Sequence, residues 1–193
     1  MYEDQLAIAA GGKLIPLWLS KEPEFLPEEY YWLIGATHRG FATRVEEVRN
    51  TFGSNISFRA DVIKALGGFK GEMGVRGKGL LQGEETEFCE RMKNVFGKGV
   101  MYNPSAVVYH KIYPERLKIG FLLKRAFWQG YSKRMMREMG FPIKEESNFL
   151  MDIIFKSIPE RIREGKLRQL GFLIILTAAV GIGYLSGFTS RWR

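Results

Sequence analysis

The sequence predicts an α/β fold in which a mixed sheet with helices is followed by an amphipathic helix and one transmembrane helix. Short β-rich runs and short helical segments alternate over the first 112 residues. A basic, aromatic segment with helical spacing follows them. Residues 170–188 then form an uncharged apolar run whose 19 residues approach the ~20 that span a bilayer.

The composition excludes several classes of protein. The chain has 193 residues, of which 46% are hydrophobic and 13% aromatic, enough to bury a core and to exclude disorder. Its one cysteine, Cys89, cannot form an internal disulfide. Disulfide-stapled secreted scaffolds and cysteine-based zinc modules are therefore excluded.

The first elements are a short strand and an irregular segment. Residues 6–10 are apolar and a pair of glycines follows, which favours a buried strand and then a turn. The next stretch is rich in prolines and rings, so we expect an irregular segment packed by its aromatic side chains. These residues are Pro16, Trp18, Pro23, Phe25, Pro27, Tyr30, Tyr31 and Trp32.

A strand, a short helix and a glycine stop come next. Ile56 and Phe58 alternate as in a strand, Asp61 is a candidate cap, and residues 62–66 form a short helix that two glycines end. Residues 71–83 are a glycine-rich loop without the Gly-Lys-Ser/Thr ending of a phosphate-binding loop.

The next segment predicts a helix over residues 84–96, ended by Gly97. Acidic residues in its first turn suit the positive end of the helix dipole. Beyond it, Pro104 divides a β-rich stretch, which predicts either two strands or one bent strand ending at His110.

Residues 114–139 mix apolar and basic side chains at helical spacing. A basic, aromatic amphipathic helix beside an apolar anchor suits a headgroup surface with anionic lipid. The alternative is an ordinary packed helix with a solvated face, and both descriptions can hold together.

The run 170–188 is interpreted as a transmembrane helix, with a buried core helix as the alternative. Residues 105–193 hold 16 basic and 7 acidic residues, a net charge of +9. Four basic residues closely precede the run and two follow it, so the positive-inside rule predicts a single-pass protein of the cell membrane with residues 1–169 in the cytoplasm. Gly183 and Gly187 also have the G-x-x-x-G spacing of close helix packing, which is common by chance.

Two places carry candidate chemistry. Glu84 and Glu85 follow a glycine-rich loop at a helix start, where a carboxylate can act as a general base on a hydroxyl or merely complement the dipole. His110 ends a predicted strand, where imidazole is either structural or a ligand for a divalent ion.

Three ordered motifs carry a family resemblance: GSNISFRADVIKALGGF, GEETEFCERM and MYNPSAVVYHKIYPERL. Together they resemble the C-terminal half of the inverting family 2 glycosyltransferases, which have the GT-A (nucleotide-diphospho-sugar transferase) fold. The resemblance runs from about Gly11 through Arg137. The basic helix and the apolar run are similar to those of membrane-bound members that build lipid-linked or cell-surface glycans, including archaeal N-glycosylation enzymes.

The resemblance implies three domains and a set of site residues. Residues 1–112 would be the acceptor-side part of a partial GT-A domain, 113–168 basic amphipathic juxtamembrane helices, and 169–189 the transmembrane helix. Glu85 falls at the position of the catalytic base, with Glu where Asp is usual and Glu84 as a possible substitute. The remaining assignments are Asn55, Gly68 and Phe69 for the acceptor and donor-sugar side, Arg116 for the diphosphate, and Cys89 and Arg91 for helix packing and surface.

The implied cofactor is Mg²⁺ or Mn²⁺, with His110 as a ligand, but the rest of the family's metal motif is absent. The only aspartates are Asp4, Asp61 and Asp152, and none is spaced as Asp-x-Asp. No nucleotide-binding β-α-β half precedes Leu6. We therefore expect the chain by itself to be inactive and to need a separate donor-binding polypeptide.

The implied function is sugar transfer, with inversion, from a nucleotide-diphosphate sugar to a hydroxyl or phosphate of a lipid-linked or cell-surface glycan. The alternative is a noncatalytic, membrane-anchored subunit that holds glycan or acts as a scaffold. A nucleic-acid partner is not expected, because the basic excess clusters beside the apolar run and no helix-turn-helix, zinc or RNP pattern is present.

Overall fold

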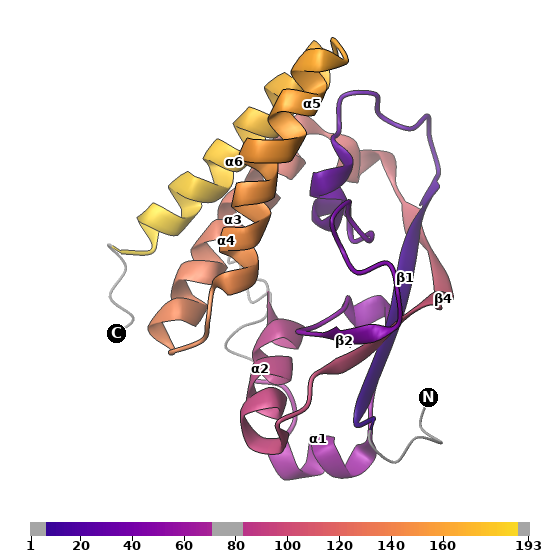
Figure 1. Cartoon of the computed structure of the whole chain (residues 1–193), viewed down its shortest axis with the longest axis vertical. Coiled ribbons are helices and arrows are strands. Elements are labelled where there is room, and N and C mark those ends of the chain that lie inside the picture. Colours follow the sequence, from indigo (N-terminus) through magenta and orange to yellow (C-terminus); the bar gives the residue numbers. More distant parts are fainter. Residues whose placement is uncertain (1–6, 71–82, 189–193) are drawn as a thin grey trace. The chain divides into compact units, whose positions relative to one another are not determined.

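The structure is a computed structural model that describes residues 7–70 and 83–188. The chain divides into two compact units, each built from discontinuous segments (Figure 1). The first unit comprises Met1–Leu17, Gly35–Thr37 and Phe41–Lys111. The second comprises Trp18–Ile34, His38–Gly40 and Ile112–Arg193. The predicted three-domain division is not tested by this partition and stays a prediction.

The four described strands form one sheet in the order β2-β4-β1-β3. They are β1 (Ala9–Trp18), β2 (Glu46–Val48), β3 (Ile56–Phe58) and β4 (Val100–Ile112). β3 pairs antiparallel with β1, and β2 pairs antiparallel with β4. β1 and β4 run in the same direction, because Gly12 lies against Ala106 and Leu19 donates to the carbonyl of Ile112 further along both strands. The predicted α/β class with a mixed sheet is confirmed.

The prediction of a turn at the glycine pair was wrong, because β1 continues through Gly11 and Gly12 as far as Trp18. A Cβ on Gly11 would lie 2.8 Å from Thr51 Cγ2, and one on Gly12 would lie 2.8 Å from Ala106 Cβ. These glycines therefore permit close approach of neighbouring segments rather than a chain reversal.

The strand-helix-stop prediction is confirmed at β3 and α1 (Ala60–Leu66), which Gly67 ends at a φ of +71°. The expected cap was wrong: Asp61 lies inside the helix, and Arg59 is at the N-cap without a side-chain cap bond. The helix over residues 84–96 is confirmed as α2 (Glu84–Phe96), ended by Gly97 at a φ of +66°. Most of the predicted glycine-rich loop, residues 71–82, lies outside the described residues.

A small apolar core lies between the sheet and these two helices. Ala9 of β1, Val62 of α1, Cys89 and Met92 of α2 and Val100 of β4 belong to one buried cluster. Pro104 does not divide β4, which is a single strand that passes His110 and ends at Ile112. The sequence around Pro104 was compatible with either one bent strand or two separate strands.

The second unit is mainly helical. The segment expected to be irregular includes a 3₁₀ helix, η1 (Glu28–Ile34), and its rings pack as expected, with Tyr30 and Trp32 centroids 5.5 Å apart. The other elements of this unit are η4 (Pro114–Leu117), α3 (Ile119–Glu138), α4 (Lys144–Asp152), the π-helical η5 (Ile153–Ser157), α5 (Ile158–Arg163) and α6 (Leu167–Ser186). The first unit has one further short 3₁₀ helix among its described residues, η2 (Gly53–Asn55).

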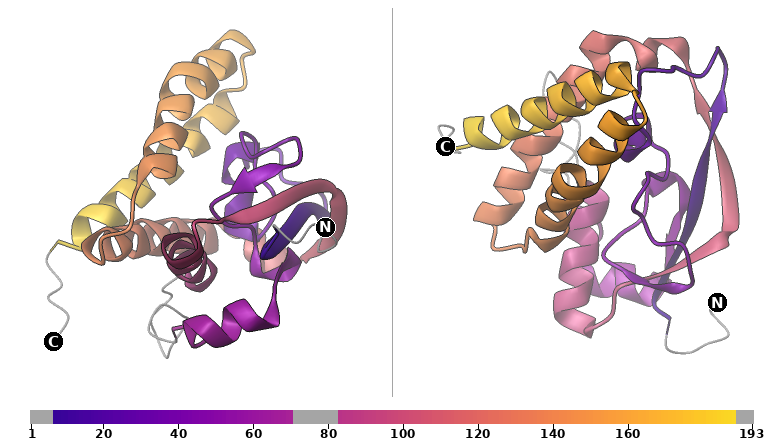
Figure 2. Two further views of the ribbon diagram at one scale, coloured as in Figure 1. Left: turned by 60° about the horizontal axis from the view of Figure 1, so that its bottom comes forward. Right: turned by 45° about the horizontal axis from the view of Figure 1, so that its top comes forward.

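The long helices α3 and α6 lie side by side (Figure 2). Gly130 and Gly183 permit this contact, because an added Cβ would lie 2.8 Å from the carbonyl carbon of Val180 and 2.7 Å from that of Phe127, respectively. α6 has 20 residues and a mean hydropathy of 1.8, so by length and composition it can cross a membrane. The sequence left open that residues 114–139 form an ordinary packed helix. This alternative is confirmed for α3, whose Leu122 and Ala126 are wholly buried.

Candidate active site

The candidate base lies at the first turn of α2. Gly83 precedes the helix at a φ of +127°, a conformation that favours glycine, and three acidic residues follow within one turn. Glu84 and Glu85 are both partly exposed, whereas Glu87 is wholly buried. The helix start therefore presents two adjacent carboxylates to solvent and turns the third inward.

The carboxylate of Glu85 rests on the backbone of Gly53, in the turn before β3. A Cβ added to Gly53 would lie 3.2 Å from Cδ of Glu85 and would collide with Oε1. The first two resemblance motifs, far apart in sequence, therefore meet at this contact. Glycine at position 53 leaves the space that the longer glutamate side chain occupies.

Asn55 fastens the same turn to the sheet. Its Nδ2 donates to the carbonyl oxygens of Lys13 at 3.2 Å and Ala106 at 2.9 Å, which lie on β1 and β4. The Thr51 hydroxyl donates to the carbonyl of Asn55 at 3.1 Å. Both amide hydrogens of Asn55 are thus engaged within the chain, and a contact between Asn55 and substrate stays a prediction.

Gly68 and Phe69 dock on α2 rather than on Glu85. The carbonyls of Leu66 and Gly68 accept hydrogen bonds of 2.7 and 2.8 Å from the guanidinium of Arg91. The Phe69 ring packs on that of Phe88, with centroids 4.6 Å apart. The structure gives these two residues a place in the turn that leads toward α2, and their substrate contacts stay predictions.

Arg91 has the packing role that the resemblance implied, but its side chain is mostly buried in a hydrogen-bond network instead of lying at the surface. Its guanidinium forms a two-pronged hydrogen bond with the wholly buried carboxylate of Glu87, at 2.7 and 3.0 Å. The same side chain holds the glycine turn, so one arginine joins α2 to the chain that follows α1. The i,i+4 spacing of Glu87 and Arg91 was the available signal.

Cys89 belongs to the packed face of α2, as expected. Its side chain is wholly buried, and burial, with smaller contributions from the charges of Glu85 and Glu90, raises the pKa of the thiol to about 12. The thiol therefore stays protonated and unreactive near neutral pH.

His110 lies away from the Glu85 contact, and Arg116 belongs to the other unit. The His110 ring lies against Gly35, where an added Cβ would be 3.1 Å from Nε2. His110 is four residues beyond Ala106 on β4, about 13 Å along the strand. Arg116 belongs to the second unit, where it donates to the carbonyl of Ile34 at 3.4 Å.

Among residues 7–70 and 83–188, no group of three or more His, Cys, Asp or Glu side chains could hold a metal ion. His110 alone does not make a cation site, since Mg²⁺ prefers several oxygen ligands in octahedral geometry. The described residues therefore do not fit the implied metal by themselves, and the Mg²⁺ or Mn²⁺ prediction stays untested.

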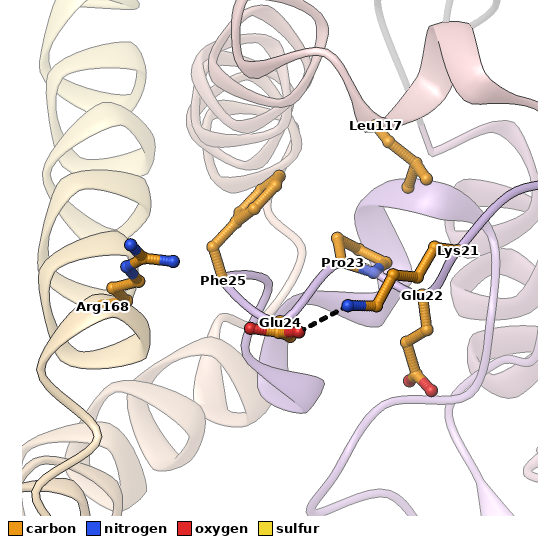
Figure 3. A pocket seen from close by; sticks show the side chains of 7 residues that line it. All are labelled: Lys21, Glu22, Pro23, Glu24, Phe25, Leu117 and Arg168. Atoms are coloured by element: carbon orange, nitrogen blue, oxygen red, sulfur yellow. Dashed lines mark hydrogen bonds and ion pairs between the residues drawn. The ribbon is translucent and has the colours of Figure 1, made fainter.

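The second unit has a shallow groove of about 380 Å³ beside the first turn of α6 (Figure 3). Pro23, Phe25 and Leu117 supply its apolar surface. Its lining has two basic and two acidic residues: Lys21, Arg168, Glu22 and Glu24. Lys21 pairs with Glu24 at 2.8 Å, and Glu22 accepts a hydrogen bond of 2.7 Å from the Tyr31 hydroxyl. Arg168 reaches the groove from α6.

A buried ion pair ties η1 to α5 in the second unit. Arg161 donates to both carboxylate oxygens of Glu29, at 2.9 and 2.5 Å, and both side chains are about 5% exposed. Burial would raise the pKa of Glu29, but hydrogen bonds from Ser157 and Arg161, its own backbone amide and the Arg161 charge outweigh it and hold the pKa below its usual value. Glu29 is therefore ionised near neutral pH.

Comparison with known proteins gives one informative similarity. The chain is 40% identical over 189 residues, 94% of its length, to a glucosyl-dolichyl phosphate glucuronosyltransferase of Haloferax volcanii. It spans 60% of the length of that relative. No family model matches the chain, and no solved structure matches it. The similarity supports a glycosyltransferase-related function, in agreement with the resemblance seen in the motifs.

Proposed function

We propose that this chain carries the acceptor-side part of an inverting GT-A glycosyltransferase that acts on a lipid-linked glycan at a membrane. The observation that carries the proposal is the 40% identity over 189 residues to a glucuronosyltransferase whose name specifies a glucosyl-dolichyl phosphate. The donor is then a nucleotide-diphosphate sugar, and the acceptor a sugar hydroxyl on a dolichyl-phosphate lipid.

Glu85 is the general base in this proposal. Its carboxylate takes the proton of the acceptor hydroxyl as that oxygen bonds to the anomeric carbon of the donor sugar. The bond from the anomeric carbon to the nucleoside diphosphate breaks on the opposite face, and its electron pair leaves with the diphosphate. The configuration at that carbon is therefore inverted.

The geometry around Glu85 suits this role in two respects. The side chain is partly exposed, so a hydroxyl can reach it, and the 53–55 turn beneath it is fastened to two strands through Asn55. A general base must be held within hydrogen-bond reach of the proton that it removes. Glu84, its neighbour, has no contact with Gly53 among the closest atoms there.

A divalent cation would offset the charge that develops on the leaving diphosphate. Because the described residues assemble no such site, no step above depends on one. Metal dependence is proposed only for a form of the protein in which other residues join His110 to complete the ligand set of the cation.

Membrane association is part of the proposal. α6 is long and apolar enough to enter a bilayer, and a dolichyl-linked acceptor resides in one. The single crossing with residues 1–169 in the cytoplasm remains the prediction from the sequence.

The test uses a chimera in which residues of this chain replace the aligned 189 residues of the Haloferax volcanii relative. The readout is transfer of labelled glucuronic acid to glucosyl-dolichyl phosphate in detergent. We expect the chimera to be active and Glu85→Gln to lower turnover by about 10²–10⁴-fold, the usual contribution of a general base. Binding of the nucleotide sugar should be unchanged.

Glu84→Gln is the matched control, since it removes the adjacent carboxylate from the same helix turn. Its turnover should stay within a few-fold of the parent chimera. Equal loss in both variants would remove the special role of Glu85. A folded, acceptor-binding chimera that never transfers sugar would favour the noncatalytic alternative.

A further inference from the structure

We propose that α6 lies in the plane of the membrane surface together with α3, instead of crossing the bilayer. The inference rests on the proposed membrane association and specifies its geometry. The occupant of the exposed face of α6 is then the headgroup and upper acyl region of a bilayer that contains anionic lipid.

One face of α6 is part of the protein core along most of its length. Leu173 and Leu176 are wholly buried, and the Thr177 hydroxyl forms a 2.8 Å hydrogen bond with that of Tyr30 in η1. Nearer the start of the helix, Phe172 packs on Phe25 of the groove, with centroids 4.5 Å apart. A spanning helix surrounded by lipid would have to give up these contacts.

α3 accompanies α6 to its end. Gly130 contacts Val180, and Arg134, further along α3, contacts Gly187, so the two helices run in the same direction (Figures 1 and 2). α3 has one acidic residue, Glu138, and five basic ones: Lys124, Arg125, Lys133, Arg134 and Arg137. A crossing of α6 with its partner attached would carry Lys124 and Arg125 toward the bilayer centre.

Such a crossing is energetically costly. Each Lys or Arg at the centre of a membrane helix costs roughly 2.5–3.5 kcal/mol on insertion scales. Glu29, which pairs with Arg161, is the neighbour in sequence of Tyr30, and Tyr30 is bonded to Thr177 of α6. This ion pair would therefore approach hydrocarbon as well. The packing of α6 on charged elements thus favours a shallow location, in which these groups stay in water or among headgroups.

The opposite face of α6 has the form of an interfacial helix. Ile174, Ile175, Ile182 and Leu185 are between 49% and 63% exposed. Ile182 follows Ile175 by seven residues and Ile174 by eight, and Leu185 follows Ile182 by three. These spacings place the four side chains on one stripe of the helix. A single apolar stripe opposite a packed face enters a bilayer by about 5–10 Å while the helix lies parallel to the surface.

Basic residues border this stripe at both ends. Lys166 and Arg168 are exposed at the start of α6, and Arg168 lines the groove shown in Figure 3. At the other end, Arg134 lies 3.4 Å from the centroid of the Phe188 ring, and Arg137 donates to the Tyr184 hydroxyl at 2.7 Å. Cations near anionic headgroups contribute about 1 kcal/mol each, and aromatic rings favour the interface.

The decisive experiment measures on which side of a sealed vesicle the two ends of α6 lie. Lys166→Cys and Ser186→Cys are introduced separately into the full chain, expressed in cells, and labelled in oriented membrane vesicles with a membrane-impermeant maleimide. Cys89 does not interfere, because it is wholly buried. We expect both cysteines to react from the same side; reaction from opposite sides would overturn the proposal and restore a single crossing.

A second measurement tests the occupant. The purified chain is floated with vesicles of phosphatidylcholine alone or with phosphatidylglycerol added, for the parent and for Ile182→Glu. Val95→Glu, at a residue of α2 that is 64% exposed, is the matched control. We expect at least tenfold weaker vesicle binding for Ile182→Glu, an unchanged Val95→Glu, and weaker binding without phosphatidylglycerol.

Two other outcomes would contradict the inference. Unchanged vesicle binding of Ile182→Glu removes the stripe from the membrane contact. The second outcome is a parent chain that forms a dimer, an Ile182→Glu variant that is monomeric, and no vesicle binding by the parent or the variant. The stripe would then be the contact surface for a second copy of the chain. Neither outcome bears on sugar transfer, which the chimera measures in detergent, so failure of this inference is distinguishable from failure of the proposed activity.

Discussion

Gly53 and Glu85 form the contact on which the candidate site depends, and the pair makes a sharp prediction. In Gly53→Ala, the new Cβ takes the space of the Glu85 carboxylate, which lies at the end of a flexible side chain and can swing away. We expect the free energy of unfolding to change by less than about 1 kcal/mol, while turnover of the chimera falls at least tenfold. Urea unfolding and the transfer assay measure the two effects.

Gly12→Ala is the comparison for that variant. There the added Cβ meets the backbone carbonyl of Ala106 and the Asn55 amide, which cannot move without shifting β4. Its loss should appear as destabilisation, by a few kcal/mol as in other overpacked sites. Equal stability losses at both positions would mean that the Gly53 contact is structural only.

His38 gives the second unit a stability that depends on pH. Burial lowers the pKa of its imidazole to about 4 from 6.5, although the Glu29 charge opposes the shift. The unfolded chain therefore binds a proton that the folded chain excludes, and stability falls as pH drops from about 6.5 toward 4. We expect a loss of about 2 kcal/mol between pH 7.5 and pH 5, measured by urea unfolding.

His38→Phe is the control, because it keeps a ring beside Phe149, whose centroid lies 5.8 Å from that of His38. The variant should lose the pH dependence between 7.5 and 5. Below about pH 4.5, protonation of Glu29 adds a further loss, since its folded pKa is below the unfolded value. A persistent slope in His38→Phe would assign the effect to another group.

Among single residues, the sequence pattern itself marked Glu84 and Glu85 as candidate carboxylates, but the choice of Glu85 as the base and of Asn55 as a site residue came only from the family resemblance. Their local pattern, acidic residues at a helix start and a polar residue in a turn, is equally typical of ordinary caps and turns. The hydrogen bonds from Arg91 to the carbonyls of Leu66 and Gly68 and the contact at Gly53 were not predictable, because each joins residues from separate elements whose approach depends on tertiary packing.

Among the elements, the crossing of α3 and α6 is the most sensitive to substitution. In Gly183→Ala, the Cβ would press on the backbone of Phe127, so the helices must separate. We expect destabilisation by about 1–3 kcal/mol. In the same helix, Gly181 has open space around a new Cβ, and Gly181→Ala should be neutral or more stable, by up to about 1 kcal/mol. Thermal unfolding in detergent compares the two.

Element types were well predicted where periodicity and stops agreed, as in α2 between Gly83 and Gly97. Predictions failed where a residue with a strong local tendency served a nonlocal purpose. The glycines of β1 serve close packing rather than a turn. At Pro104, where one bent strand and two strands were both open, the structure has the single strand β4. The 3₁₀ helix η1 had no signal beyond its aromatic residues, since rings predict burial but not backbone geometry.

For the molecule as a whole, the absence of Asp-x-Asp from the sequence has a measurable consequence. We expect the purified 193-residue chain to show no Mn²⁺-dependent binding of nucleotide sugar in calorimetry, because His110 alone cannot hold the ion that would anchor a diphosphate. The chimera with the relative should bind under the same conditions. Metal-dependent binding by the chain alone would mean that it forms its own donor site.

The α/β class was predictable, but the division into two units was not. Hydrophobic patterning reports local elements, whereas each unit combines segments that are separated in the sequence. The apolar run shows the same limit: its composition fits a spanning helix, and only the packing of Leu173 and Leu176 shows that one face belongs to a protein core.

The bond between Tyr30 and Thr177 joins residues 147 positions apart, which matters during synthesis of the chain. At about 5–20 residues per second, a ribosome needs roughly 7–30 s to make the intervening chain. Leu33 and Ile34, buried in the finished unit, have no completed core during that time. The nascent chain therefore exposes an aromatic, apolar segment that a chaperone can bind until α6 emerges.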